Sequence, residues 1–225
     1  MPQIEWHPVW LSLQVALAAL VLTACVGISA AHWMTGHEFR GKSLIEGLLI
    51  LPLVLPPVVT GYILLLLIGK KGPIGAWLEQ FGARLIFTPS AAILAASIVA
   101  FPLMYQSAKA AFLSLDPFWQ DAARSLGASS WRVFWTITLP LAWPGLAAGA
   151  ILTLARALGE FGATIMVAGN IKGQTTTMPL AIYMAAEGGD LEVAAIYSAL
   201  LGALNLIFLV ALNHWTRRQK RLKTR

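Results

Sequence analysis

Charged residues are scarce in this chain. Asp, Glu, Lys and Arg make up 12% of its 225 residues, and 58% of the residues are hydrophobic. A soluble globular domain carries about 25% charged residues, and the mean hydropathy of this chain is +0.72. This composition excludes an ordinary soluble domain. It predicts an all-α integral membrane protein, because a helix satisfies its own backbone hydrogen bonds in lipid.

Cysteine and clustered histidine are also missing. The single cysteine, Cys25, excludes a disulfide framework and a cysteine-rich metal site. The four histidines are scattered without the spacing of metal ligands, so we expect neither a metal nor a cofactor. No clustered set of catalytic groups stands out, and we expect a protein that is not an enzyme.

A nucleotide-binding loop is absent as well. The stretch LLIGKKG contains a Gly-Lys pair, but Leu64 stands where a P-loop has its first glycine. No Ser or Thr follows Lys70, although a P-loop needs that hydroxyl for Mg²⁺. If the chain depends on ATP, another protein must hydrolyse it.

Positive charge is concentrated at the carboxyl terminus. The net charge is +6, and a tail at 216–225 follows the last apolar run. Its basic residues are Arg217, Arg218, Lys220, Arg221, Lys223 and Arg225. Such a tail is typical of the cytoplasmic flank of a last span, in contact with anionic lipid. It has no folded domain around it, so we do not expect it to bind nucleic acid.

The amino terminus lacks the positive charge of a targeting signal. No Lys or Arg precedes the first apolar run, and Glu5 lies where a signal peptide is basic. The stretch LTAC at 22–25 resembles a lipoprotein cleavage box. Without the basic region we expect instead an uncleaved first span that contains Cys25.

Long charge-free runs predict the membrane spans. A helix needs about 20 apolar residues to cross the hydrocarbon core. We expect spans near 9–33, 44–69, 87–111, 136–158 and 192–214. A further stretch, FGATIMVAG at 161–169, is too short to cross and is expected to form a half-helix or re-entrant turn. The count is therefore five spans, or six if this stretch is part of another crossing.

The distribution of Lys and Arg predicts the orientation. With the amino terminus outside, the cytoplasmic side receives Arg40, Lys42, Lys109, Arg124, Arg132 and the basic tail. The outer side receives Lys70, Lys71, Arg84 and Lys172. This asymmetry favours an outer amino terminus and a cytoplasmic carboxyl terminus. Lys70 and Lys71 are local exceptions to it.

A polar segment at 116–135 interrupts the apolar runs. Asp116 before a proline predicts a helix start, because Asp caps a helix and Pro favours its first position. Gly127 suits the left-handed residue that ends such a helix, and Ser129 or Ser130 suits the cap of a second one. Both helices are too short to span, so we expect a helix-turn-helix on the cytoplasmic face.

Small and aromatic side chains distinguish the surface of this segment. Ala122 and Ala123 leave a flat area that another protein's backbone can approach closely. Trp131, Phe134 and Trp135 are expected at the level of the lipid headgroups. From these residues alone, a protein-binding surface and an amphipathic helix that lies on lipid are equally open.

The spacing of the segment resembles the EAA motif of ABC-transporter permease subunits. That motif reads Glu-Ala-Ala, three residues, Gly, nine residues and Ile-x-Leu-Pro. The matching residues are Asp121, Ala122, Ala123, Gly127, Ile137, Leu139 and Pro140, and only the acid differs. The resemblance implies a type I importer permease fold, with 1–225 as one permease domain. It also implies that 116–135 is a coupling loop in a cleft of the ATPase subunit.

Two other stretches, 50–75 and 156–183, resemble molybdate permeases, and sulfate permeases share much of the second. The resemblance implies an inner-membrane subunit that imports molybdate. In the inner membrane, the outer amino terminus expected above is periplasmic. Its implied partners are a second copy of itself, two ABC ATPase subunits and a periplasmic molybdate-binding protein. Import of sulfate, thiosulfate or tungstate is the alternative, because tetrahedral oxyanions differ little in size and charge. A channel or structural membrane protein would not need the motif-spaced loop.

Prolines predict a break in the second span. Pro52, Pro56 and Pro57 remove backbone hydrogen bonds, and the freed carbonyls are tolerated where they face protein or a water-filled cavity. We therefore expect this break, with Thr60 beside it, to line the pore. A kink that serves only packing is the alternative.

Arg156 and Glu160 are ionisable residues one turn apart at the outer end of a span. They form either an anion guide at the outer gate or an ion pair that stabilises the gate region. The ion pair is favoured, because a paired Arg has less charge left for an oxyanion. The polar loop at 169–179 suits either docking of the binding protein or plain exposure to solvent.

Overall fold

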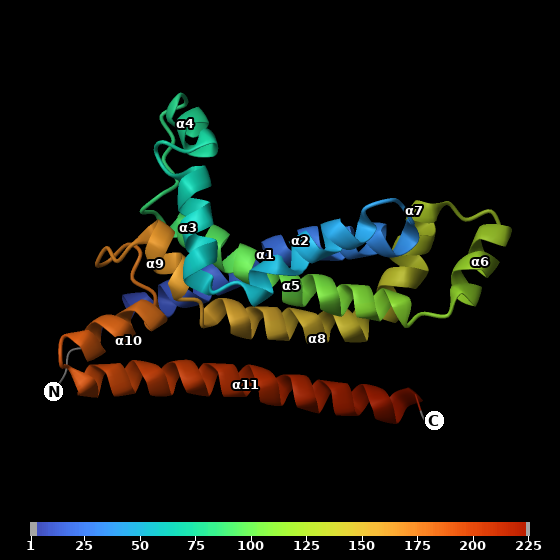
Figure 1. Cartoon of the computed structure of the whole chain (residues 1–225). Coiled ribbons are helices and arrows are strands. Elements are labelled where there is room, and N and C mark those ends of the chain that lie inside the picture. The colour runs from blue at the N-terminus through green and yellow to red at the C-terminus, as the bar shows by residue number, and fades with distance from the viewer. Residues whose placement is uncertain (1–3, 224–225) are drawn as a thin grey trace.

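The computed structural model describes residues 4–223, and all regular structure within them is helical. Figure 1 shows long, nearly parallel helices that form a bundle, with shorter helices at both of its ends. The elements are α1 (His7–Gly36), α2 (Lys42–Val54), α3 (Pro57–Ile68), α4 (Pro73–Glu79), α5 (Pro89–Leu113), α6 (Pro117–Ser125), α7 (Ser130–Val133), the π-helix η1 (Phe134–Thr138), α8 (Leu139–Leu158), α9 (Gly162–Ala168), α10 (Met178–Glu187) and α11 (Leu191–Lys223).

Small side chains allow α1, α5 and α8 to pack closely at the centre of the bundle. Each of these helices contacts the other two. A Cβ atom placed on Gly27 of α1 would lie 3.3 Å from Cγ of Met104 in α5, so this contact has little spare room. Close approach of this kind stabilises helices in lipid, where van der Waals contact replaces the hydrophobic effect. The buried alanines of α1 and α5 include Ala16, Ala19, Ala31, Ala92, Ala95, Ala96, Ala100 and Ala108.

The predicted spans are present, with one broken. Within residues 4–223, four helical segments are long and apolar enough to cross a membrane, and a fifth is reached if α2 and α3 count as one broken span. The four are His7–Gly36, Pro89–Leu113, Ser130–Leu158 and Leu191–Ala211. They correspond to the first, third, fourth and fifth expected spans.

The second expected span, 44–69, is not a continuous helix. α2 and α3 meet with a bend of 115°. Leu55 and Pro56 each precede a proline, a position that disfavours helical backbone, and both are extended with ψ of 141° and 134°. As a result α2 runs along the bundle and α3 turns across its end (Figure 1).

The short stretch at 161–169 forms α9, which has seven residues and cannot cross a membrane alone. α9 packs on α3 through small residues. A Cβ on Gly61 would lie only 2.7 Å from Cα of Ala163, so the two backbones are in direct contact. The expected outer loop at 169–179 is shorter than predicted, because α10 begins at Met178.

α11 extends beyond the fifth expected span and reaches Lys223. Its contacts are with α8 and α10. It lies at the edge of the bundle, and side chains such as Leu206 and Ile207 are exposed. The basic side chains of the tail at 216–225, together with the whole of 224–225, lie outside the described part of the structure.

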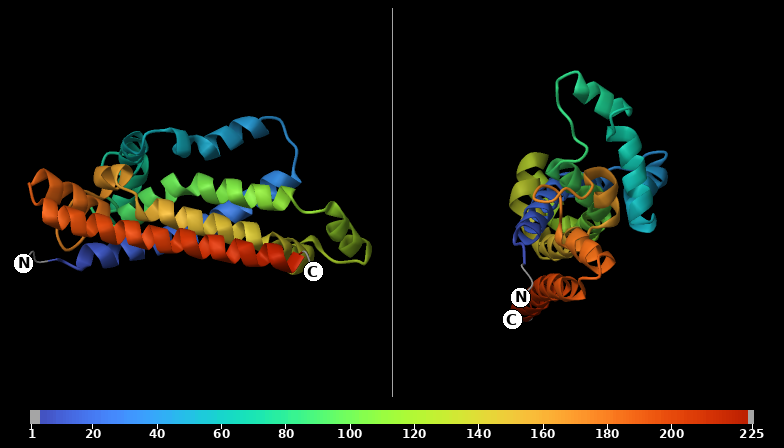
Figure 2. Two further views of the ribbon diagram at one scale, coloured as in Figure 1. Left: turned by 90° about the horizontal axis from the view of Figure 1, so that it is seen from below. Right: turned by 90° about the vertical axis from the view of Figure 1, so that its left-hand side faces the viewer.

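The connections gather at two opposite ends of the bundle (Figures 1 and 2). One end, called the inner end here, carries the loop between α1 and α2, the segment around α6, and the far end of α11. The other, called the outer end, carries the start of α1, α4, α9, α10 and the start of α11. The names follow the orientation that the distribution of Lys and Arg predicts.

We expect a topology reporter fused after Arg225 to be active only in the cytoplasm. A reporter fused to the amino terminus should be active only outside, because an odd number of crossings separates the two ends. Measuring reporter activity in cells checks both. An amino terminus in the cytoplasm would contradict the five-span count and make 161–169 part of a sixth crossing.

Candidate functional site

α6 forms the first half of the expected coupling loop at 116–135. Oδ1 of Asp116 accepts a hydrogen bond from the backbone N–H of Phe118 at 3.0 Å. Pro117 lies in the first turn, where its missing N–H costs nothing. The helix start that the sequence predicts is confirmed.

Gly127 ends this helix in the left-handed conformation, with φ of +83°. Its N–H donates to the carbonyl of Arg124 at 2.9 Å, and the N–H of Ala128 donates to the carbonyl of Ala123 at 3.1 Å. These two bonds make a Schellman motif, which satisfies carbonyls at the helix end. A Cβ at position 127 would meet no atom within 4 Å, so only the backbone conformation requires glycine here.

The three residues of the acid-Ala-Ala sequence differ in exposure. Oδ1 of Asp121 accepts a hydrogen bond from Nη1 of Arg124 at 3.2 Å, and both side chains are exposed. An exposed pair of this kind stabilises little, so the carboxylate stays available to a partner. Ala122 and Ala123 are half-buried, and the flat surface expected of them is therefore partly covered.

The second half of the loop contains a π-helix. Oγ of Ser129, one of the two expected caps, accepts a hydrogen bond from the N–H of Arg132 at 3.4 Å and begins α7. In η1 the N–H of Leu139 donates to the carbonyl of Phe134, five residues back. The wider turn accommodates Pro140, whose ring would clash with a carbonyl four residues earlier in a regular α-helix.

The last motif residues lie where the loop enters the bundle. Ile137 and Leu139 are half-buried, and Pro140 is exposed. Thr138 between them is buried, with 2% of its surface exposed. The motif thus has an exposed acid in α6 and its last apolar residues where the loop enters the bundle.

An aromatic cluster connects the coupling loop to the bundle. The ring of Phe134 lies 4.5 Å from that of His32 in α1, and His32 lies 5.5 Å from Phe112 in α5. Trp131 and Trp135 pack edge to face at 5.4 Å. A displacement of Phe134 therefore changes a direct contact with α1, and His32 connects that contact to α5. Sequence analysis did not identify His32, because an isolated histidine carries no signal of its neighbours.

The coupling loop leaves large apolar side chains uncovered. Leu126 is 90% exposed, and large exposed apolar patches mark interaction sites. A cavity of about 430 Å³ lies beside this surface, between α1, α5 and α6, and His37 and Arg124 are among the residues that line it. The other large apolar side chains that the loop exposes are Phe118, Trp119, Trp131 and Trp135.

The pore candidates Pro56, Pro57 and Thr60 lie at the bend of the broken span. Cβ of Pro57 would lie 3.0 Å from a Cβ placed on Gly162, so the bend packs directly on the start of α9. Thr60 is 5% exposed, and its hydroxyl has no hydrogen-bond partner among the described residues. This packing is expected if the bend serves only to pack the two helices on their neighbours. A pore-lining role stays a prediction.

Arg156 and Glu160 form an ion pair at the outer end. Oε2 of Glu160 lies 2.8 Å from Nη1 of Arg156, and this oxygen makes no hydrogen bond with a described residue. Oε1 accepts a hydrogen bond from the N–H of Ala163 at 2.8 Å and so caps α9. The Glu160 side chain is 2% exposed and that of Arg156 is 28% exposed. The pair is therefore present, and a guiding role for Arg156 stays a prediction.

An ion pair between two helices was not identified from the sequence. Nζ of Lys109 in α5 lies 2.6 Å from Oε1 of Glu46 in α2, and the hydroxyl of Tyr105 donates to the same oxygen at 3.5 Å. α2 has no buried residue, and this pair adds a polar contact to the packing of Leu49 and Ile50 on the bundle. Opposite charges within apolar segments were the available signal, but a separation of 63 positions in the chain conceals the contact.

The fold and the loop define the class of this protein. Residues 13–221 match the family described as "Binding-protein-dependent transport system inner membrane component", and the chain belongs to this family. A solved structure of a bacterial alginate ABC transporter, in complex with its alginate pentasaccharide-bound periplasmic protein, has the same fold. The TM-score is 0.78 at 18% identity, over 97% of this chain and 80% of that one. The chain is thus a component of a transport system and not itself an enzyme.

Within the family, relatives named for molybdenum transport are more similar to this chain than a sulfate permease is. The Bacillus subtilis protein YvgM is 52% identical over 188 residues, which cover 83% of each chain. ModB of Haemophilus influenzae is 43% identical over 219 residues, which cover 94% of each chain. The sulfate permease CysW of Synechocystis is more distant, at 36% identity over 88% of this chain and 72% of its own.

We expect Gly127→Val to insert and dimerise but to retain little ATPase subunit. Valine in the left-handed region costs on the order of 1 kcal/mol or more, and its β-branch adds strain at χ1. Gly127→Ala is the matched control and should be milder, because no neighbouring atom opposes a Cβ at this position. ATPase subunit retained on the purified permease, together with uptake, is measured. Normal retention and uptake in Gly127→Val would remove the coupling role of the loop.

We expect Arg156→Gln to lower thermal stability and uptake, because it leaves the buried Glu160 carboxylate without its counter-charge. Breaking a buried pair costs about 3–5 kcal/mol, and less where one partner is partly exposed as here. The double variant with Glu160→Gln should recover much of the loss, since a glutamine oxygen still accepts from Ala163. Melting temperature and uptake are compared across the three proteins. Impaired uptake in a double variant of normal stability would instead support an anion guide.

Proposed function

We propose that this chain is the permease subunit of an ABC importer that carries molybdate across the cytoplasmic membrane. The observation that carries this proposal is the coupling loop. Its motif residues form a defined helix-turn-helix at one end of the bundle, in a chain 52% and 43% identical to permeases named for molybdenum transport. The predicted orientation places this loop in the cytoplasm, where ATP is available.

Two separate ABC ATPase subunits drive the import. The chain carries no P-loop, so its movement must be driven by a partner. The coupling loop offers that partner an exposed acid at Asp121 and uncovered apolar side chains such as Trp119 and Leu126. Its rigid ends, the Asp116 cap and the Gly127 turn, hold this surface in one shape.

The permease acts as a homodimer with the solute path between its two copies. The centre of a single bundle is filled by closely packed alanines of α1 and α5 and leaves no room for a path there. α2 has no buried residue, and α3 exposes apolar side chains such as Tyr62 and Leu66. A second copy related by a two-fold axis can cover such surfaces on both chains at once.

A periplasmic binding protein delivers the substrate and supplies most of the selectivity. Arg156 is neutralised by Glu160, so it offers little free charge with which to select among oxyanions. Sulfate, thiosulfate and tungstate resemble molybdate in shape and charge, and import of one of them is the alternative. The lower identity to a sulfate permease favours molybdate.

We expect vesicles that contain the reconstituted complex to accumulate labelled molybdate only with ATP and the loaded binding protein. Unlabelled molybdate and tungstate should compete, because their sizes are nearly equal, whereas excess sulfate should compete weakly, because this chain is less similar to a sulfate permease. Vesicles without the ATPase subunit are the control. Sulfate that competes as well as molybdate would reassign the substrate, and uptake without ATP would contradict an ABC importer.

A further inference from the structure

The outer end of the bundle carries opposite charges on opposite sides. The loop at 69–88 contains Lys70, Lys71 and Arg84 against a single acid, Glu79. The segment from α10 into α11, residues 178–192, contains no Lys or Arg. It carries three exposed acids, Glu187, Asp190 and Glu192. Viewed along the bundle, α4 and α10 lie on opposite sides of it (Figure 2, right).

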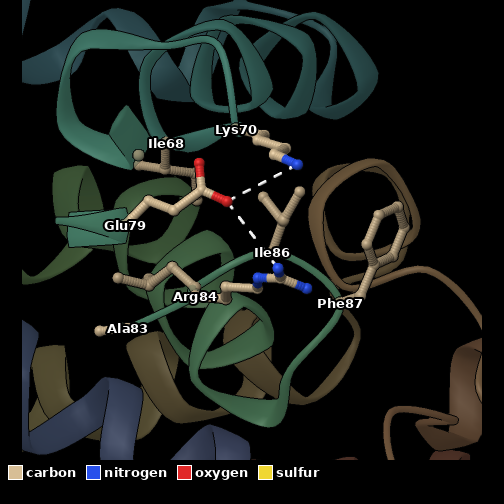
Figure 3. Close-up of a pocket in the computed structure, with 9 residues that line it drawn as sticks. Ile68, Lys70, Glu79, Ala83, Arg84, Ile86 and Phe87 are labelled. Atoms are coloured by element: carbon tan, nitrogen blue, oxygen red, sulfur yellow. Dashed lines mark ion pairs between the residues drawn. The ribbon is translucent and has the colours of Figure 1, made fainter. Parts of the chain in front are cut away.

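The loop at 69–88, called the α4 knob here, has one carboxylate, Glu79, close to cations from its beginning and its end. Figure 3 shows Glu79 between two cations: its Oε1 lies 3.7 Å from Nζ of Lys70 and 3.8 Å from Nη2 of Arg84. One carboxylate therefore joins the beginning and the end of the loop. The N–H of Phe87 donates to the carbonyl of Val167 at 2.8 Å and attaches the loop to α9. The knob projects from the bundle beyond α3 (Figure 1).

The surface of the knob combines positive charge with aromatic side chains. Lys71 is exposed and makes no ion pair with a described residue. Trp77 and Phe81 pack edge to face at 5.1 Å and are 57% and 70% exposed. Tryptophan is enriched among the residues that dominate protein–protein binding, and exposed charges of one sign steer a partner of the opposite charge. The knob thus has the composition of a protein-binding surface for an acidic partner.

The neighbouring loop at 169–177, by contrast, uses its polar groups internally. Oγ1 of the fully buried Thr175 accepts a hydrogen bond from the N–H of Ile171 at 2.8 Å. Thr176 donates to Oδ1 of Asn170 at 2.6 Å. Lys172 forms an ion pair with Glu5 at 2.7 Å, and this contact raises the pKa of Lys172. The loop therefore presents little unpaired charge to a partner.

We propose that the α4 knob docks an acidic patch of the periplasmic binding protein, while the acidic turn between α10 and α11 faces a basic patch of the same protein. The inference rests on the proposed function and adds to it the surface and the charge of the partner. Complementary charges at two separated points fix the orientation of docking and increase the rate of association. They also give a reason for Lys70 and Lys71 to lie at the outer end, where the orientation rule disfavours them.

The test measures the binding of labelled, molybdate-loaded binding protein to the reconstituted permease–ATPase complex. We expect Lys71→Glu and Glu187→Lys each to weaken binding by about three- to tenfold at low salt, the range for reversal of one surface charge pair. The difference from the unchanged complex should shrink at high salt, because ions screen exposed charges. Lys71→Arg keeps the charge and should bind normally. Lys172→Glu is the matched reversal outside the knob and should bind normally too.

The outcomes separate the inference from the proposed function. If the complex without substitutions binds no molybdate-loaded binding protein, the proposed function is contradicted. The proposed docking surface is then contradicted as well. Normal uptake and binding in the unchanged complex, with weakening only in Lys172→Glu, would place docking on the loop at 169–177 and overturn the inference. Unaltered binding in both Lys71→Glu and Glu187→Lys would also overturn it, and the knob would then be assigned to lipid headgroups.

Discussion

Close packing of small residues in α1, α5 and α8 is the contact on which the rest of the structure depends. In lipid there is no hydrophobic gain from bringing apolar helices together, so their association requires close van der Waals contact. The alanines of α5 and the glycine at position 27 provide it. The coupling loop continues from α5 into α8, and the Arg156–Glu160 pair joins the outer end of α8 to α9. Both candidate sites are thus attached to one rigid centre, and α8 carries a part of each.

Features that depend on a few neighbouring residues could be predicted from the sequence. The cap at Asp116 and the left-handed Gly127 follow from local chemistry, and the structure has both. The break before Pro57 follows from proline sterics as well. The size of the bend could not be predicted, because it is set by how closely Gly61 packs on Ala163, a contact between segments about a hundred residues apart.

Contacts distant in the sequence were the features that sequence analysis missed. The pairing of Glu46 with Lys109 joins two segments that each read simply as apolar spans. The helix α10 was not predicted: only its first two residues fall within the polar loop expected at 169–179, and ten residues are too few for a span. Its position depends on Ser12 of α1, whose hydroxyl accepts a hydrogen bond from the N–H of Met178 at 2.7 Å. Such a partner cannot be recognised before the fold is known.

The π-helix η1 determines the direction in which the coupling loop faces. Residues of a regular α-helix follow one another at about 100° around its axis. A hydrogen-bonded π turn contains one residue more than an α turn. The residues before Phe134 are therefore rotated about the helix axis by about that angle, compared with where a regular α-helix would place them. The π-helix at 134–138 therefore sets the rotation of the loop about the helix axis relative to the bundle. Two permeases with identical loop residues would present them to an ATPase in different directions if one of them had a regular helix here.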